Sequence, residues 1–334
     1  MHIKEILAAA LLSLAIGGLA QPAFADCKMV QVAEMPLDAH SYGVVADGQI
    51  NGNPIKVLID TGSSLSMISR PAAAKMGLAV AQKSGVYLYG IGGQRQAYVA
   101  TVKSLQVGQL AAANIDLIAS DGFGNPNLAM ILGNDILSQF DVEFDLPDHM
   151  MRLFKPEGCV ADQLAYWNKP YSLAPLLDTN RDSPSIRTPV NLNGQRISAE
   201  LDSGAGSTVV DITTASRLGA VVDPSVTTQP ARGMGQAPRA VSIGQFKSFA
   251  LGEEQIGNVK IELIKLVSDM QMTDQQTDTR IARSVSGDTE PMMLIGEDFL
   301  HAHRVLVANR EHAILFSYLG GPVFATPAVA KPAP

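Results

Sequence analysis

The sequence has few cysteines and no excess of positive charge, and each shortage excludes a class of protein. Two cysteines in 334 residues are too few for a disulfide-rich scaffold or for a CxxC…CxxC zinc site. The formal net charge is −7, so the chain lacks the basic surface that nucleic-acid binding requires. Apart from an apolar run at the N-terminus, no segment is a candidate membrane span. We therefore expect neither a nucleic-acid partner nor a membrane span in the mature chain.

Several catalytic motifs are also missing. The sequence contains no Gly-x-Ser-x-Gly, no His-Glu-x-x-His and no P-loop. His301 and His303 are close in sequence but have no third ligand nearby, so we interpret them as exposed surface residues and expect no metal site.

The first 25 residues are typical of a secretory signal peptide. Lys4 precedes an apolar run from Ile6 to Ala20, and Ala23-Phe24-Ala25 forms a small-residue cleavage signature. The run is shorter than the ~20 residues of a membrane span, although an uncleaved anchor is the alternative. We expect residues 1–25 to be removed and the protein to be periplasmic or secreted. In such an oxidising compartment, Cys27 and Cys159 are expected to form a disulfide, with two unpaired buried thiols as the alternative.

The two halves of the chain repeat each other. Residues 51–77 and 193–219 align without a gap at an offset of 142 positions. Each copy begins with an Asn-Gly pair, a strong signal for a β-hairpin, and its second strand ends on an acidic residue, Asp60 or Asp202. The pattern predicts a duplicated, β-rich domain.

Further features recur in the same order in both halves. Glycine-containing turns follow at Gly90-Ile91-Gly92-Gly93 and at Gly233-Met234-Gly235. Later, an apolar strand runs into a glycine and a helix start at 130–135 and again at 293–298. Asp135 and Asp298 follow that glycine, where we interpret them as helix caps.

This order predicts the domain organisation. We expect an N-terminal lobe at 26–158, a connector with the single Trp167 at 159–183, and a C-terminal lobe at 184–320. The second half has a polar insertion, Ser268 to Pro291, interpreted as a surface loop. The Ala/Pro-rich residues 321–334 are expected to be a disordered tail.

Paired Asp-Thr/Ser-Gly triplets, glycine turns and apolar-apolar-Gly strands together resemble the retropepsin-like aspartic proteases. The resemblance extends from about Tyr42 to Tyr318 and suggests two such units fused in one chain. It implies a mainly β fold with a few short helices, built as a pseudo-twofold pair of β-barrel lobes, the bilobal acid-protease fold. Because the duplication is internal, we expect a monomer.

The resemblance also implies the roles of individual residues. Asp60 and Asp202 match the catalytic pair, which shares one proton and activates a water molecule without cofactor or metal. Thr61 and Ser203 match hydroxyls that lock the two loops together, and Gly62 and Gly204 are expected to permit tight turns. The two glycine turns match flaps that close over an extended peptide.

The residue after each triplet differs between the halves. We expect the Ser63 hydroxyl to donate to Asp60, whereas Ala205 has no such donor for Asp202. A missing donor leaves the carboxyl pKa higher, which predicts a pH optimum at mildly acid to near-neutral values.

The expected function is therefore an aspartic endopeptidase acting on a peptide or protein substrate. The main alternative is a catalytically inactive module of the same fold that binds peptides or a protein partner in the periplasm. For each aspartate alone, a structural role within its own turn is the competing explanation.

Overall fold

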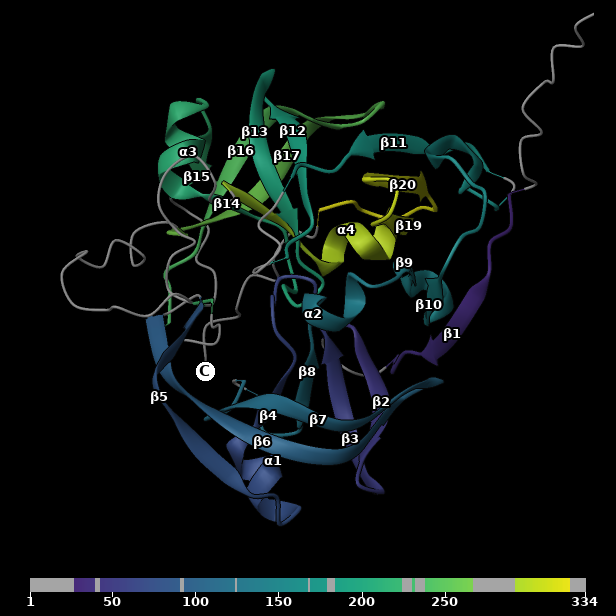
Figure 1. Cartoon of the computed structure of the whole chain (residues 1–334). Coiled ribbons are helices and arrows are strands. Elements are labelled where there is room, and N and C mark those ends of the chain that lie inside the picture. Colours follow the sequence, from purple (N-terminus) through teal and green to yellow (C-terminus); the bar gives the residue numbers. More distant parts are fainter. Residues whose placement is uncertain are drawn as a thin grey trace, which may run out of the picture.

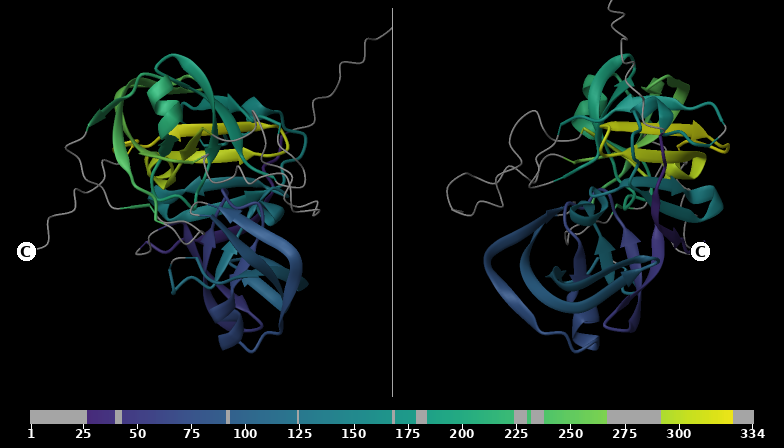
Figure 2. Two further views of the ribbon diagram at one scale, coloured as in Figure 1. Left: turned by 90° about the vertical axis from the view of Figure 1, so that its left-hand side faces the viewer. Right: turned by 45° about the vertical axis from the view of Figure 1, so that its right-hand side comes forward.

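The computed structural model shows two lobes, one above the other, with a sheet between them (Figures 1 and 2). It describes residues 27–39, 43–90, 93–123, 125–167, 169–178, 184–223, 230–231, 238–266 and 292–324, of which 83–90, 93–95 and 223 are described as backbone only. The expected signal peptide and the expected surface loop from Ser268 to Pro291 lie outside these ranges. No helix within them is long and apolar enough to span a membrane.

The first lobe, the lower one in Figure 1, is a closed β-barrel. Six strands follow the order β2-β3-β8-β4-β7-β6, pairing of β2 with β6 closes the barrel, and β5 pairs with β6 outside it. The strands are β2 (Val45–Ile50), β3 (Asn53–Ile59), β4 (Met67–Ser69), β5 (Val80–Gly90), β6 (Gly93–Val107), β7 (Leu110–Ser120) and β8 (Met130–Leu132).

The second lobe repeats this topology strand for strand. Its barrel follows the order β12-β13-β18-β14-β17-β16 and is closed by pairing of β12 with β16, while β15 pairs with β16 outside it. The strands are β12 (Arg187–Leu192), β13 (Gln195–Leu201), β14 (Val209–Asp211), β15 (Val221–Asp223), β16 (Ser242–Leu251), β17 (Glu254–Ile264) and β18 (Met293–Ile295). The predicted duplication and mainly β fold are confirmed.

Matching hairpin turns join the first two strands of each barrel. Asn51 and Gly52 have φ angles of 50° and 80°, and Asn193 and Gly194 have 52° and 77°. A two-residue hairpin turn of this hand needs positive φ at both positions, which asparagine tolerates and glycine adopts without steric cost. In the strands that follow, alternate residues face the barrel interior; in β13 these are Ile197, Ala199 and Leu201.

A six-stranded sheet joins the lobes, with three strands on each side of its centre. Its order is β1-β10-β9-β19-β20-β11, and β9 from the first half pairs with β19 from the second. All five residues of β9 are buried, because both faces of the sheet are covered. The strands are β1 (Gln31–Pro36), β9 (Asp141–Asp145), β10 (Met150–Phe154), β11 (Ser172–Pro175), β19 (His303–Ala308) and β20 (Ala313–Tyr318).

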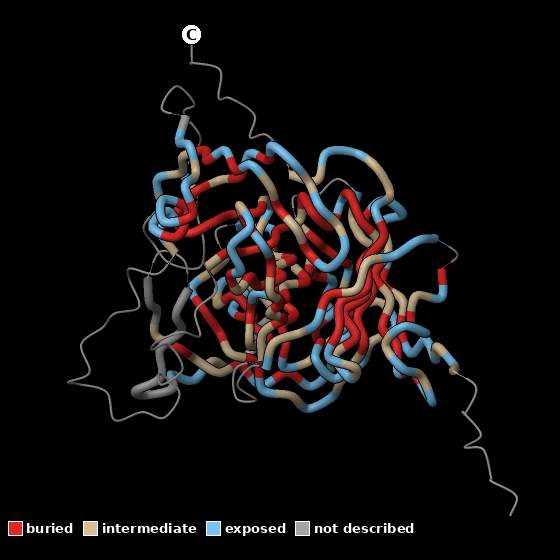
Figure 3. The backbone as a smooth tube through the Cα atoms, turned by 90° about the horizontal axis from the view of Figure 1, so that it is seen from above, coloured by how far each residue is buried: buried red, intermediate tan, exposed pale blue. Residues whose placement is uncertain are grey.

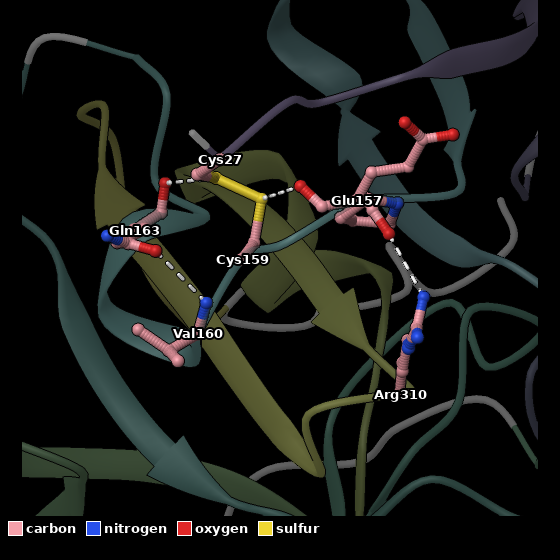
Figure 4. Close-up of a disulfide and its surroundings, with 7 residues drawn as sticks. Cys27, Glu157, Cys159, Val160, Gln163 and Arg310 are labelled. Atoms are coloured by element: carbon pink, nitrogen blue, oxygen red, sulfur yellow. Dashed lines mark hydrogen bonds between the residues drawn. A yellow bond between two sulfur atoms is a disulfide. The ribbon is translucent and has the colours of Figure 1, made fainter. Parts of the chain in front are cut away.

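The expected disulfide is present between Cys27 and Cys159 (Figure 4). It ties the segment before β1 to the connector, which packs through Trp167: the indole N–H donates to the Ser317 hydroxyl at 2.7 Å.

The first residues of the expected disordered tail are packed against the protein. Val323 and Phe324 pack on the core, and the Phe324 ring meets the Phe249 ring edge-on. Residues 325–334 lie outside the described ranges.

Short helices complete the fold. They are α1 (Arg70–Lys75), α2 (Asn134–Leu137), α3 (Ile212–Arg217) and α4 (Glu297–Ala302), with 3₁₀ turns η1 (Leu146–Asp148) and η2 (Ala161–Gln163). One continuous apolar core runs through both barrels and the sheet between them, and in Figure 3 the buried segments accordingly lie inside the molecule.

Candidate active site

Two equivalent loops carry the two aspartates. Asp60 follows β3 and Asp202 follows β13, each at the point where its strand leaves the barrel. The Asp60 N–H donates to Leu132 O at 3.0 Å, and the Asp202 N–H donates to Ile295 O at 2.9 Å. Parallel pairing of β3 with β8 and of β13 with β18 therefore continues up to the aspartate and fixes its position.

Thr61 and Ser203 lock these loops together. The Thr61 N–H donates to Ser203 Oγ at 3.0 Å, and the Ser203 N–H donates to Thr61 Oγ1 at 2.9 Å. Each hydroxyl then donates to a carbonyl of the opposite loop, Thr61 to Leu201 O at 2.6 Å and Ser203 to Ile59 O at 2.8 Å. Both side chains are fully buried. The arrangement is the mutual lock that the sequence predicted.

The lock brings the two carboxyl groups into contact. Asp60 and Asp202 hydrogen-bond to each other, and both remain partly exposed to solvent. A Cβ atom on Gly62 would overlap the Asp202 carboxyl group, and one on Gly204 would overlap that of Asp60. The expected reason for these glycines is therefore incomplete. The opposite carboxyl group leaves no room for a side chain at either position, whereas neither glycine has a positive φ.

The surroundings raise the pKa values of both aspartates. For Asp60, burial raises the pKa well above its ordinary range, and the charge of Asp202 and the hydrogen bond to it raise it further. For Asp202, burial also raises the pKa, opposed by the Gly204 N–H at 2.9 Å and by the hydrogen bond from Asp60. Both carboxyl groups therefore hold a proton more tightly than an ordinary aspartate does, which favours one proton shared by the pair.

The Ser63 prediction is wrong in its side-chain role. The Ser63 hydroxyl donates to Leu65 O at 2.8 Å and so closes its own turn instead of reaching Asp60. Only the backbone N–H of Ser63 acts on Asp60, where it lowers the pKa. In the second loop, the Ala205 N–H donates to Asp202 Oδ1 at 3.1 Å. The two positions therefore support their aspartates through the backbone, and the expected difference between serine and alanine disappears.

Asp135 and Asp298 have their main partners outside their helices, although Asp298 Oδ1 also accepts the Phe299 N–H in the first turn of α4 at 2.9 Å. Asp135 Oδ1 accepts hydrogen bonds from the backbone N–H and the hydroxyl of Ser66, at 2.9 and 2.6 Å. Asp298 Oδ1 accepts the same pair of bonds from Thr208, also at 2.9 and 2.6 Å. Each carboxylate thus braces the chain that leaves its aspartate loop. The sequence pattern placed both residues at a helix start and gave no signal for partners so distant along the chain.

Asn134 is a further residue that the sequence analysis missed. Its side-chain amide donates to Thr61 O at 2.6 Å and to Pro184 O at 3.3 Å, and it is buried. It therefore links the first aspartate loop to the beginning of the second lobe. The second half has Glu297 at the corresponding position, so comparing the two halves would not have identified it.

The glycine turns are described only in part. Gly90 pairs with Gly93 across the β5–β6 hairpin, while Ile91 and Gly92 lie outside the described residues. In the second lobe Ala231 bridges to Arg239, and Gly233, Met234 and Gly235 between them also lie outside. A flap role for either turn stays a prediction.

The interpretation of the two histidines is half wrong. His301 is exposed and contacts Glu297 at 3.0 Å, as a surface residue would. His303 is fully buried, where its ring nitrogens contact Phe299 O at 2.8 Å and Glu254 at 3.1 Å. Among the described residues, no three His, Cys, Asp or Glu side chains are grouped as a metal site would require.

Comparison with known families agrees with this geometry. Residues 46–139 match the family described as gag-polyprotein putative aspartyl protease, and residues 188–299 match the family described as aspartyl protease. The first match contains Asp60 and the second contains Asp202. No curated protein matches the chain.

Proposed function

We propose that this chain, which carries two aspartyl protease domains in tandem, is an aspartic endopeptidase whose catalytic residues are Asp60 and Asp202. The observation that carries the proposal is the contact between the two carboxyl groups across the Thr61–Ser203 lock. Two carboxylates in direct contact and largely shielded from water cannot both be ionised near neutral pH, so the pair retains one proton.

That single proton defines the roles of the two residues. The ionised aspartate accepts a proton from a water molecule, which attacks the carbonyl carbon of the scissile peptide bond. The protonated aspartate donates a hydrogen bond to the carbonyl oxygen and stabilises the negative charge that develops there. The pair then returns a proton to the leaving amine. No covalent intermediate is required.

The lock between the lobes serves this chemistry by fixing geometry. Both carboxyl groups sit on loops that are hydrogen-bonded to each other through the Thr61 and Ser203 hydroxyls, and whose backbones are hydrogen-bonded to the strands β8 and β18. Little reorganisation is then needed as charge shifts between the two oxygens and the substrate. We propose that the substrate is an extended peptide, and that the glycine turns at 90–93 and 233–235 would close over it and add strand-like hydrogen bonds.

We also propose that the protein acts in the periplasm or outside the cell, as a monomer. The N-terminal signal pattern and the Cys27–Cys159 disulfide both support export, because a disulfide persists in an oxidising compartment. The internal duplication supplies both halves of the site from one chain.

The test is cleavage of denatured casein and of a mixed peptide library by the wild type and by Asp60→Asn and Asp202→Asn. Each substitution should lower kcat/KM by at least about 10³-fold, since the pair acts as a unit. Asp47→Asn, whose side chain is 82% exposed, is the matched control and should retain activity.

Folding of the variants is checked by circular dichroism and thermal unfolding. A wild type that cleaves nothing between pH 3 and 8 (about the range in which such pairs titrate) would contradict the proposal. If peptides then bind equally to the wild type and both Asn variants, the inactive binding module is the better description.

A further inference from the structure

The two lobes differ at one pair of positions close to the aspartates. In the first lobe Val45 pairs with Leu58 between β2 and β3, and in the second Arg187 pairs with Glu200 between β12 and β13. The strands, the register and the distance to the aspartate are the same. An apolar pair in one lobe is thus replaced by an ion pair in the other.

The glutamate of this ion pair is buried and the arginine is partly exposed. Glu200 is 7% exposed, the Arg187 side chain is 22% exposed, and Arg187 Nε lies 3.3 Å from Glu200 Oε2. A buried ion pair is seldom a net gain in stability over an apolar pair of similar volume. The first lobe shows that the fold accepts the apolar pair at this place. Stability alone is therefore a weak reason for Glu200, and its location suggests another.

Glu200 is the penultimate residue of β13 and stands two residues before Asp202, which directly follows the strand and continues its pairing with β18. Because alternate residues of a strand share a face, Glu200 and Asp202 lie on the same side of the chain. The ionisable groups that act on the Glu200 carboxyl are Arg187, from β12, and Asp202 itself. On its other side, β18 places the uncharged Leu294 opposite Glu200.

We propose that Glu200, held by Arg187, is a positioning residue that keeps the shared proton on the Asp60–Asp202 pair as the pH rises. This inference rests on the proposed function. When Glu200 is ionised, its negative charge opposes the appearance of a second negative charge on the pair, so the pair stays singly protonated and active to higher pH.

Glu200 changes its charge near neutral pH, where the aspartate pair would otherwise lose its shared proton. Burial raises its pKa to about 7, with Arg187 lowering it and Asp202 raising it. Interaction between two titrating groups is reciprocal, so an ionised Glu200 raises the pKa of the pair in turn. Below about pH 7 Glu200 is mostly protonated, and it then has no charge with which to act on the pair.

The test compares pH profiles of kcat/KM for the wild type, Glu200→Gln and Glu200→Asp. Glu200→Gln should move the alkaline limb to lower pH by about 0.5–1 unit, while its acid limb stays in place. Glu200→Asp keeps the charge and should restore much of the wild-type limb. The double variant Arg187→Val/Glu200→Leu removes both charges by copying the first lobe, and should shift the limb less than Glu200→Gln does.

Carboxyl ¹³C NMR titration of the aspartate pair in the same proteins gives a readout independent of turnover. The pair loses its protons in two steps, and in Glu200→Gln the higher of its two pKa values should fall. That result would support the inference even if no cleavage were observed, in which case only the proposed function fails. An alkaline limb and an upper pKa equal to those of the wild type would overturn it. So would an equal loss of activity at every pH in Glu200→Gln and Glu200→Asp, because that is the signature of a purely structural role.

Discussion

Thr61 and Ser203 donate to each other through their backbone N–H groups and donate through their hydroxyls to Leu201 O and Ile59 O. The four hydrogen bonds are buried and cross from one lobe to the other. They join the chain immediately next to each aspartate, so any loosening between the lobes changes the separation of the two carboxyl groups.

Replacing Thr61 by Val should therefore cost both stability and activity. Valine has a similar shape but leaves the Ser203 N–H without its acceptor and Leu201 O without its donor. Each buried, unsatisfied group costs about 1–3 kcal/mol, so for two groups we expect a loss of roughly 2–6 kcal/mol in unfolding free energy. Urea unfolding and kcat measure the two effects. Thr61→Ser keeps the hydroxyl and is the matched control; a Thr61→Val protein as stable and active as Thr61→Ser would contradict this account.

The residues after the Asp-Thr/Ser-Gly triplets should be neutral for pH dependence. The Ser63 hydroxyl is bonded to Leu65 O, and the contributions of Ser63 and Ala205 to the aspartates come from their backbones. We expect Ser63→Ala and Ala205→Ser to leave both limbs of the pH–kcat/KM profile within about 0.3 unit of the wild type. A clear acid shift in Ala205→Ser would show that its hydroxyl does reach Asp202.

The local parts of this site were predictable from the sequence, and the long-range parts were not. Asn-Gly turns and Asp-containing loops repeat in the sequence itself, because their conformations depend on neighbouring residues. The Ser63 hydroxyl, by contrast, had several acceptors within reach, and only the path of the loop decides among them.

Partners that lie far along the chain escape prediction from local sequence. Asp298 sits at a helix start, yet its carboxylate also binds Thr208, 90 positions away. The sequence predicts an exposed His303, but β17 brings Glu254 onto its ring. Arg304 joins Glu143, 161 positions away, within the sheet between the lobes. No local pattern encodes which strands meet, so these partners emerge only from the topology.

Removing the disulfide should lower stability more than activity. The Cys27–Cys159 bond spans 132 positions, for which the chain-entropy model gives up to about 4–5 kcal/mol. It joins the segment before β1 to the connector, where its sulfur atoms lie near Gln163 O and Glu157 O (Figure 4). We expect Cys27→Ala/Cys159→Ala to unfold at a lower urea concentration while keeping its kcat at 25 °C. Reductant should destabilise the wild type and leave the double variant unchanged; an unaffected wild type would refute the stabilising role.

Asp141 should make the protein less stable as the pH rises from about 4 to 6. Asp141 lies in the buried strand β9 and is 2% exposed. Burial raises the pKa of its carboxyl group from 3.8 to about 6, although hydrogen bonds from the backbone N–H groups of Arg310 and Asn309 act in the opposite direction. The folded state thus binds the proton more tightly than the unfolded state does. Its stabilising contribution is complete below about pH 4 and is lost as the pH rises through 6.

Asp141→Asn removes this dependence. Asparagine keeps an oxygen that can accept the Arg310 N–H, which lies 3.3 Å from Asp141 Oδ1, but carries no charge to bury. A shift from 3.8 to about 6 corresponds to at most about 3 kcal/mol, so the variant should be more stable than the wild type by up to that amount at pH 7 and about equal to it at pH 4. Urea unfolding across this range measures the difference, with exposed Asp148→Asn as the control. If Asp141→Asn and wild type show parallel stability from pH 4 to 7, the Asp141 carboxyl is not the group responsible, and burial in β9 does not cost the folded state what its pKa implies.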